Sequence, residues 1–170
     1  MDYLVVYTSK TGNTEKVALK IFETLPGKSK DIVRLEDLRG EEADTYFVGF
    51  WSNRGTCNTE VIDFLSDLHG RRVALFGTCG MAGNREYYKQ VEKQVSVFLP
   101  EDNEYLGCFL CGGKLPTQIL EKYRQMQALH DTPQIRAMIS AYEAGMLHPN
   151  EEDFKNACEF AESVIETGRR

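Results

Sequence analysis

The sequence has no long apolar run and little positive charge, and these two absences exclude whole classes of protein. No stretch approaches the roughly 20 consecutive apolar residues that a membrane-spanning helix requires. The short apolar run near Met1 follows an acidic residue, where a signal peptide would carry positive charge. With 20 Lys and Arg against 26 Asp and Glu, the formal net charge is −6. We therefore expect neither a membrane nor a nucleic acid as partner, because no basic stripe is present to neutralise phosphates.

Cysteine and histidine are sparse and irregularly spaced. The cysteines stand at 57, 79, 108, 111 and 158, an odd number without the regular spacing of a disulfide framework. Free thiols of this kind are typical of a reducing compartment, so we expect a cytoplasmic protein. The histidines, at 69, 130 and 148, lack the spacing of metal ligands, and we expect no metal site.

What is present is an alternation of strand-like and helix-like patterns. Near-continuous apolar runs rich in β-branched and aromatic residues occur at Tyr3–Tyr7, Ile32–Leu35, Tyr46–Trp51, Val73–Phe76 and Tyr105–Leu110. Such runs are typical of parallel strands that are covered on both faces. Amphipathic helical patterns lie between most of them. The alternation predicts a single α/β domain over residues 1–170, with a doubly wound parallel sheet.

Further helical patterns follow the last predicted strand. They run from Ile119 to Tyr123, from Ile135 to Tyr142 and from Phe154 to Ile165, with Thr132 and Asn150 as expected N-caps. The segment 112–149 is expected to be a helical insertion before the last helix. The sequence leaves open whether this insertion covers a ligand, forms a homodimer or docks a partner.

The first predicted strand leads directly into "TSKTGNT", residues 8–14, which is rich in small hydrogen-bonding groups. In an open parallel sheet, ligands bind beyond the carboxyl ends of the strands, and this segment stands at such an end. Its hydroxyls, Gly12 and the free N–H groups of a helix start are suited to hold a phosphate. The same residue types also occur in capped turns without a ligand, so the pattern alone leaves both interpretations open.

Other phosphate-binding motifs are absent or incomplete. The sequence contains neither a Gly-x4-Gly-Lys-Ser/Thr loop nor a Gly-x-Gly-x-x-Gly fingerprint after the first strand. "CGMAGNR", Cys79 to Arg85, has the Cys-x5-Arg spacing of cysteine phosphatases, where an arginine and backbone N–H groups hold phosphate over a thiolate nucleophile. Glu86 stands where such an enzyme needs a hydroxyl and would repel phosphate. A phosphatase that uses Cys79 and Arg85 is the alternative function that this motif suggests.

Cys108 and Cys111 have the spacing of a redox pair. They lie in and just after a predicted strand, where residues i and i+3 face opposite sides of the sheet. We therefore expect two inert thiols that do not meet, because a redox Cys-x-x-Cys pair works at a helix start.

The segment "YTSKTGNT" resembles the FMN phosphate loop of flavodoxins. "VGFWSNRGTCN", residues 48–58, and "VALFGTCGM", residues 73–81, stand where that family places its two flavin-ring loops. The resemblance implies a flavodoxin-like three-layer sandwich, with strand order 2-1-3-4-5 and helices on both faces of the sheet. It also implies FMN as cofactor and electron transfer to or from a partner reductase. "CGGKLP" and "HPNEEDFKNACEFAESV" resemble a subgroup from anaerobic bacteria, and this implies a tetrapyrrole reductase such as bilirubin reductase as partner.

Transferred position by position, the resemblance implies three groups of FMN-binding residues and no catalytic residue. The phosphate group comprises Thr8, Ser9, Lys10, Thr11, Gly12, Asn13 and Thr14; the first ring loop comprises Trp51, Ser52, Asn53, Arg54 and Gly55; the second ring loop comprises Gly77, Thr78, Cys79, Gly80 and Met81. Trp51, the single tryptophan, is the candidate for stacking on the flavin, although a core-facing tryptophan is the alternative. Met81 stands where the family usually carries an aromatic residue. A scaffold for protein contacts that holds no cofactor is a further alternative.

Overall fold

The computed structural model describes residues 1–52 and 54–168. Strands and helices alternate along the first part of the chain, and three helices follow the last strand. Their order is β1 (Tyr3–Tyr7), α1 (Asn13–Thr24), β2 (Lys30–Arg34), the 3-10 turn η1 (Leu35–Asp37), β3 (Thr45–Trp51), α2 (Thr59–Ser66), β4 (Arg72–Cys79), α3 (Arg85–Ser96), β5 (Glu104–Gly112), α4 (Thr117–Leu129), α5 (Pro133–Gly145) and α6 (Glu151–Thr167).

The strands form one parallel sheet in the order β2-β1-β3-β4-β5, which confirms the predicted fold. The strand order reverses between β1 and β3, because the chain places β2 on one side of β1 and all later strands on the other. In sheets of this kind, a crevice opens at the carboxyl ends of the strands on either side of that reversal. The loops that follow β1, β3 and β4 are therefore brought to one edge of the sheet.

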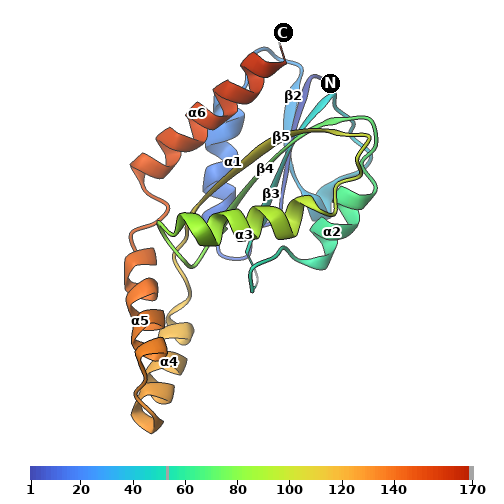
Figure 1. Ribbon diagram of the computed structural model, residues 1–170. Helices are drawn as coiled ribbons and strands as arrows, with labels where there is room; N and C mark the ends of the chain where they lie inside the picture. Colours follow the sequence, from blue (N-terminus) through green and yellow to red (C-terminus); the bar gives the residue numbers. More distant parts are fainter. Residues whose placement is uncertain (53, 169–170) are drawn as a thin grey trace.

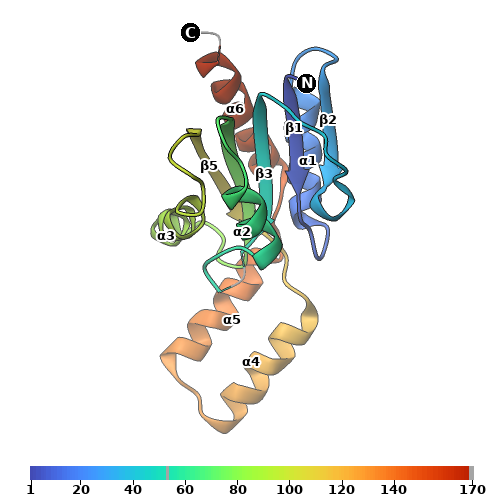
Figure 2. The same cartoon turned by 90° about the vertical axis from the view of Figure 1, so that its right-hand side faces the viewer.

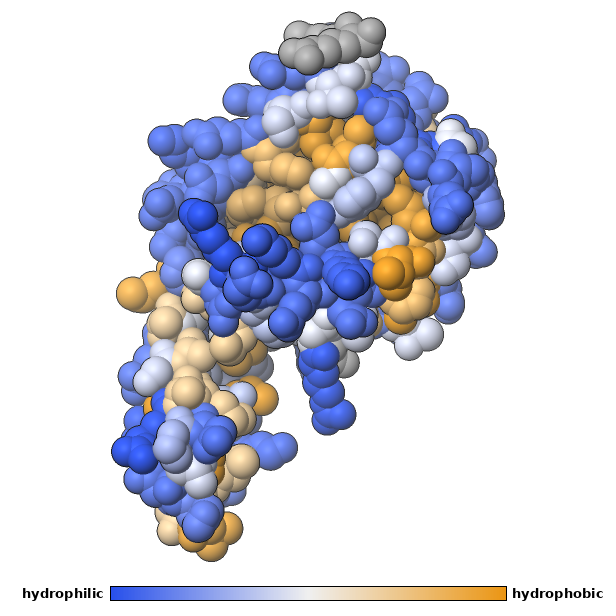
Figure 3. Space-filling model, in the orientation of Figure 1, coloured by the Kyte–Doolittle hydropathy of each residue, from blue (hydrophilic) through white to orange (hydrophobic). Residues whose placement is uncertain are grey.

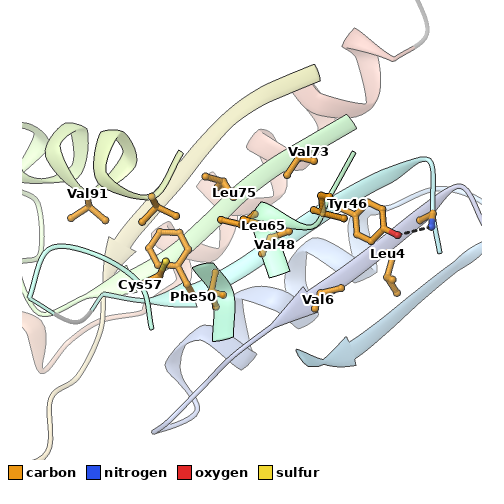
Figure 4. Packing of buried hydrophobic residues seen from close by; sticks show 14 residues of the cluster. Leu4, Val6, Tyr46, Val48, Phe50, Cys57, Leu65, Val73, Leu75 and Val91 are labelled. Atoms are coloured by element: carbon orange, nitrogen blue, oxygen red, sulfur yellow. Dashed lines mark hydrogen bonds between the residues drawn. The ribbon is translucent and has the colours of Figure 1, made fainter. Parts of the chain in front are cut away.

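Helices cover both faces of the sheet and enclose two apolar cores (Figure 1). Successive residues of a strand face opposite sides, so Leu4 and Val6 belong to one core while Val5 belongs to the other. Figure 4 shows the core beneath α2 and α3, where the Tyr46 hydroxyl accepts a hydrogen bond from the Ala43 amide at 3.2 Å. Each fully buried Val, Leu or Phe contributes about 1.5–3 kcal/mol to folding.

The helices α4 and α5 form an antiparallel hairpin that extends away from the sheet (Figures 1 and 2). The hairpin leaves the body at the edge that carries the carboxyl ends of the strands. No described residue of α4 is buried, whereas α5 buries Ile135, Tyr142 and Gly145. The hairpin is thus fixed to the body mainly at its root, where β5 passes into α4 and α5 passes into α6.

The surface combines a hydrophilic body with mixed apolar and polar side chains on the hairpin (Figure 3). An apolar area also lies on the body where the edge strand β5 runs between α3 and α6, because Leu106, Phe109 and Leu110 are only half-buried. Among the helices of residues 1–52 and 54–168, none is both long and apolar enough to cross a membrane.

Candidate functional site

A cavity of about 340 Å³ opens at the edge of the sheet where the strand order reverses. Three of its walls come from the segments after β1, β3 and β4, in which the sequence predicted the binding residues. A fourth wall comes from the connection between β5 and the start of α4. The lining residues are Ser9, Lys10, Thr11, Asn13, Thr14, Trp51, Ser52, Thr78, Cys79, Gly80, Gly113, Lys114, Leu115, Pro116 and Ile119.

The loop between β1 and α1 has the form of an anion cradle. Gly12 precedes α1 with φ at 89°, a left-handed conformation that glycine adopts without steric cost. The Ser9 hydroxyl accepts hydrogen bonds from the amides of Gly12 at 3.1 Å and Glu15 at 3.4 Å, which holds the loop in a tight turn. The amides of Asn13 and Thr14 lie in the first helical turn, where no carbonyl of the helix precedes them as acceptor. The loop therefore presents N–H donors and the positive end of a helix to the cavity.

The charge of the acidic residue in this first turn is balanced by an arginine. Glu15 forms an ion pair with Arg34 at the end of β2. The pair keeps a carboxylate next to the loop from acting as a lone negative charge toward an anionic ligand. Lys10 and Lys114 both line the cavity and add positive charge to it.

Thr14 and Thr78 join the predicted phosphate loop to the second predicted ring loop. Their hydroxyl oxygens lie 2.9 Å apart, and the residues are only 1% and 3% exposed. The Thr14 hydroxyl also lies 3.4 Å from the carbonyl oxygen of Phe50, at the end of β3. The two threonines thus connect the three strand ends that surround the cavity.

Trp51 ends β3 with its side chain half-buried. The Lys10 ammonium lies 5.5 Å from the centroid of the indole ring, which is within the range of a cation–π contact. Trp51 lines the cavity and also a neighbouring hollow of about 370 Å³ that contains Thr8 and Asn58. The tryptophan is therefore not a core residue but a partition between two surface hollows. The Ser52 amide donates to the Thr78 carbonyl at 2.8 Å and so joins the two predicted ring loops.

Several residues of the predicted site lie outside the lining of this cavity. Arg54 and Gly55 have left-handed φ values of 53° and 87° and border a separate hollow beside Tyr87. A Cβ on Gly77 would stand 2.7 Å from the Phe50 carbonyl oxygen, so this glycine serves close packing of β3 and β4. Met81 is 37% exposed and does not line the cavity. Thr8 and Gly12 are also absent from its lining, and Asn53 lies outside the described residues. Their contacts with a cofactor stay predictions.

The wall from Gly113 to Ile119 is not among the site residues that the sequence predicted. The sequence linked "CGGKLP" only to a family resemblance. Its position after the fifth predicted strand could also have indicated a place in the site, because ligands bind beyond the carboxyl ends of parallel strands. Nothing local in the segment indicates that it reaches the loop between β1 and α1. The structure shows this contact, since the Asn13 side-chain amide donates to the Lys114 carbonyl at 2.9 Å across 101 residues of sequence.

The thiols of Cys79, Cys108 and Cys111 are placed as inert groups. The Cys79 Sγ atom lies 3.8 Å and 3.7 Å from the carbonyl oxygens of Met81 and Cys111, and burial raises the pKa of the thiol to about 11. A phosphatase needs an ionised thiolate over an anion cradle, so this geometry disfavours that alternative. Cys108 and Cys111 lie in the two different cores, which confirms that they face opposite sides of β5.

The strand order β2-β1-β3-β4-β5, with helices on both faces and a cavity at the reversal point, defines a flavodoxin-like α/β domain. The family model described as "Flavodoxin domain" matches residues 4–162, so the chain belongs to the flavodoxin family. The chain is 33% identical over 170 residues to the flavodoxin-like domain-containing protein BilS of Clostridioides difficile (strain CD3), with 97% of each chain covered.

Solved structures repeat the same fold. A flavodoxin from Streptococcus pneumoniae TIGR4 superposes with a TM-score of 0.63 at 21% identity, over 98% of this chain and 99% of that chain. A flavoprotein from Lactobacillus acidophilus NCFM, solved in complex with FMN, superposes with a TM-score of 0.50 at 15% identity. That alignment covers 71% of this chain and 97% of the flavoprotein.

Proposed function

We propose that the protein binds FMN and transfers electrons to or from a partner reductase. One observation carries the proposal: a helix-start cradle, a tryptophan and a small-residue loop line the same cavity at the reversal point of a parallel sheet. The cavity volume of about 340 Å³ lies within the range of small-molecule and cofactor sites. The FMN complex of the Lactobacillus flavoprotein supports the choice of ligand.

Each wall has a chemical task in this proposal. The amides of Asn13 and Thr14 and the hydroxyl of Thr11 hold the phosphate, which carries about −1.5 to −2 charges at neutral pH. Trp51 provides a flat apolar contact for the flavin ring. Gly80 and its neighbours keep the second loop small, so that backbone groups reach the polar edge of the ring. The bound flavin would supply the electron-accepting group, a task for which the small and aliphatic side chains of the lining are unsuited.

The composition of the site favours a carrier over a stand-alone enzyme. Among the described residues that line the cavity, none is Asp, Glu or His, and the charged ones are Lys10 and Lys114. A hydrolase or an isomerase needs a positioned acid or base within hydrogen-bonding reach of its substrate. A flavin that passes electrons to another protein needs no such group. The partner proposed is a reductase, and the resemblance of the "CGGKLP" segment to the subgroup from anaerobic bacteria favours one that acts on tetrapyrroles.

The proposal is tested by comparing FMN with riboflavin, which has the same ring and no phosphate. Isothermal titration of the purified apo chain should show FMN binding at least about a hundredfold more tightly than riboflavin, because only FMN occupies the cradle. A Thr11→Glu variant places a carboxylate in the cradle and should lose FMN while binding riboflavin as before. Equal affinity of the unmodified chain for the two ligands would overturn the phosphate assignment.

The electron-transfer part needs a separate measurement. A potentiometric titration of the FMN-loaded protein should show that the second electron enters at a potential well below that of free FMN. The physical reason is that added negative charge near a phosphate is disfavoured in a poorly hydrated site. Uptake of both electrons at the free-flavin potential would contradict a carrier role, even if FMN binds tightly.

A further inference from the structure

The connection from β5 to α4 is a built part of the cavity and not a loose linker. Gly113, Lys114, Leu115 and Pro116 line the cavity, together with Ile119 from the first turn of α4. These five residues form what we call the hairpin wall. The hairpin wall belongs to the insertion whose role the sequence left open.

Hydrogen bonds fix the hairpin wall to three other parts of the molecule. The Gly113 amide donates to the Cys79 carbonyl at 2.8 Å, at the end of β4. The Lys114 carbonyl accepts the bond from the Asn13 side chain at 2.9 Å, and the Lys114 amide donates to the His148 carbonyl at 2.8 Å. The His148 ring lies 2.6 Å from the Asp153 carboxylate in the first turn of α6. Backbone held in this way places its side chains reproducibly.

Two glycines allow the hairpin wall to approach this closely. A Cβ on Gly80 would stand 2.8 Å from the Leu115 Cδ1 atom, so Leu115 packs directly on the backbone of the second ring loop. A Cβ on Gly113 would stand 2.9 Å from the Asn13 Nδ2 atom and 3.3 Å from the Thr78 Cβ atom. The absence of side chains at these two positions brings the hairpin wall against the cradle and the ring loop at the same time.

The hairpin wall also supplies the apolar surface that the second ring loop lacks. Met81, which follows Gly80 in the second ring loop, is 37% exposed and does not line the cavity. The segment Thr78–Gly80 contributes only small side chains to the lining. The larger apolar side chains there, Trp51 apart, are Leu115, Pro116 and Ile119. The apolar part of this site is therefore divided between β3 and the root of the hairpin.

We infer that Leu115 and Ile119 are contacts of the flavin ring and supply the apolar surface that the second ring loop does not. The inference rests on the proposed function, because it assumes that the flavin is the ligand of the cavity. If this inference holds, the hairpin wall is the part of the insertion that belongs to the cofactor site. The rest of the hairpin stays free for other contacts. Leu115 and Ile119 act by excluding water from the ring and by packing on it.

The experiment uses the ring that FMN and riboflavin share. Leu115→Ala and Ile119→Ala should each weaken FMN and riboflavin by the same factor, about tenfold for the loss of a partly buried aliphatic group. Thr11→Glu, in contrast, should weaken FMN alone. Leu120→Ala is the matched control, because Leu120 is a half-buried apolar residue of α4 that does not line the cavity. Circular dichroism and the melting temperature of each apo variant establish that it is folded.

A spectroscopic measurement tests the same ring contact without relying on binding constants. Flavin absorption and fluorescence respond to water around the ring, so Leu115→Ala should make bound FMN more accessible to iodide quenching than in the unmodified protein and in Leu120→Ala. Leu115→Met, which preserves volume and apolarity, should restore both affinity and protection. If Leu115→Ala fails to fold, Ile119→Ala and its iodide accessibility decide the question.

The outcomes separate the two proposals. If the unmodified chain binds neither flavin, the proposed function fails. If it binds FMN but both alanine variants retain the affinity and iodide protection of the unmodified chain, the ring contact by Leu115 and Ile119 is wrong and the FMN proposal stands. A loss confined to FMN, with riboflavin unaffected, would also overturn the ring contact, because it would place these side chains at the phosphate.

Discussion

The hydroxyl oxygens of Thr14 and Thr78 lie 2.9 Å apart in the core beneath the cavity. Thr14 also lies 3.4 Å from the Phe50 carbonyl oxygen, whereas no second bond is formed by the Thr78 hydroxyl within the described part of the chain. The most economical arrangement is that Thr14 donates to Phe50 and accepts from Thr78. Removal of Thr14 then leaves the Thr78 hydroxyl without a partner among the described residues, while removal of Thr78 leaves the contact of Thr14 with Phe50 in place.

This relationship predicts an asymmetric and non-additive pair of substitutions. Thr14→Val should lower the free energy of unfolding by about 1–3 kcal/mol, and Thr78→Val by less, because an unsatisfied buried polar group carries the larger penalty. The double variant should cost less than the sum of the two singles. Urea denaturation monitored by circular dichroism measures all three. Additivity within about 0.5 kcal/mol would show that the two hydroxyls are not coupled.

Trp51 is expected to report directly on the ligand. It is the only tryptophan and it lines the cavity, so FMN should strongly quench its emission in apo protein. Trp51→Ala should weaken FMN by about 1–3 kcal/mol, by analogy with stacking of nucleobases on aromatic side chains. A Trp51→Phe variant keeps a ring and should lose less affinity. Unchanged tryptophan emission at saturating FMN would place the flavin away from this wall.

Lys10 is expected to set part of the redox potential. Its ammonium lies over Trp51 and beside the cradle, where it offsets negative charge on a bound ligand. Lys10→Gln should weaken FMN binding and lower the potential at which the second electron enters. Each tenfold change in the equilibrium constant of that one-electron reduction corresponds to about 59 mV. Lys28→Gln is the matched control, since Lys28 is exposed just before β2 at the opposite edge of the sheet. If the two variants lowered the potential by the same amount, the cause would be the change in net charge and not the position of Lys10.

The buried thiol of Cys79 is expected to make the folded protein less stable at alkaline pH. Burial raises the pKa of its thiol from 9.0 to about 11, so the folded state holds this proton where the unfolded state releases it. This difference contributes about 2–3 kcal/mol to the free energy of unfolding. The contribution is complete below pH 9 and is lost as the pH rises toward 11. The stability difference between the unmodified chain and Cys79→Ala should therefore shrink from pH 8 to pH 11. Thermal unfolding at several pH values measures it, and a constant difference would refute the shift.

The sheet and the tight turn between β1 and α1 were determined by the sequence itself. Short apolar runs rich in β-branched and aromatic residues are typical of strands covered on both faces, and the helical stripes between them favour a parallel sheet. Asn150 and Thr132 were recognisable as N-caps because capping depends on side chains within one turn, and both form the predicted bond. The cradle was recognisable for the same reason, since its hydroxyls and Gly12 are adjacent in sequence.

Only the tertiary structure decided which of these residues share a cavity. Gly77 and Met81 are adjacent in sequence to lining residues, yet close packing against Phe50 and exposure at the surface remove them from it. Lys114 and Leu115 enter because parallel pairing of β4 with β5 brings Gly112 level with Cys79, and the next residues then reach the cradle. Such contacts depend on strand register and on the close approach that Gly80 and Gly113 permit. A local pattern holds no information about a partner about 100 residues away, because that distance closes only when the sheet is formed.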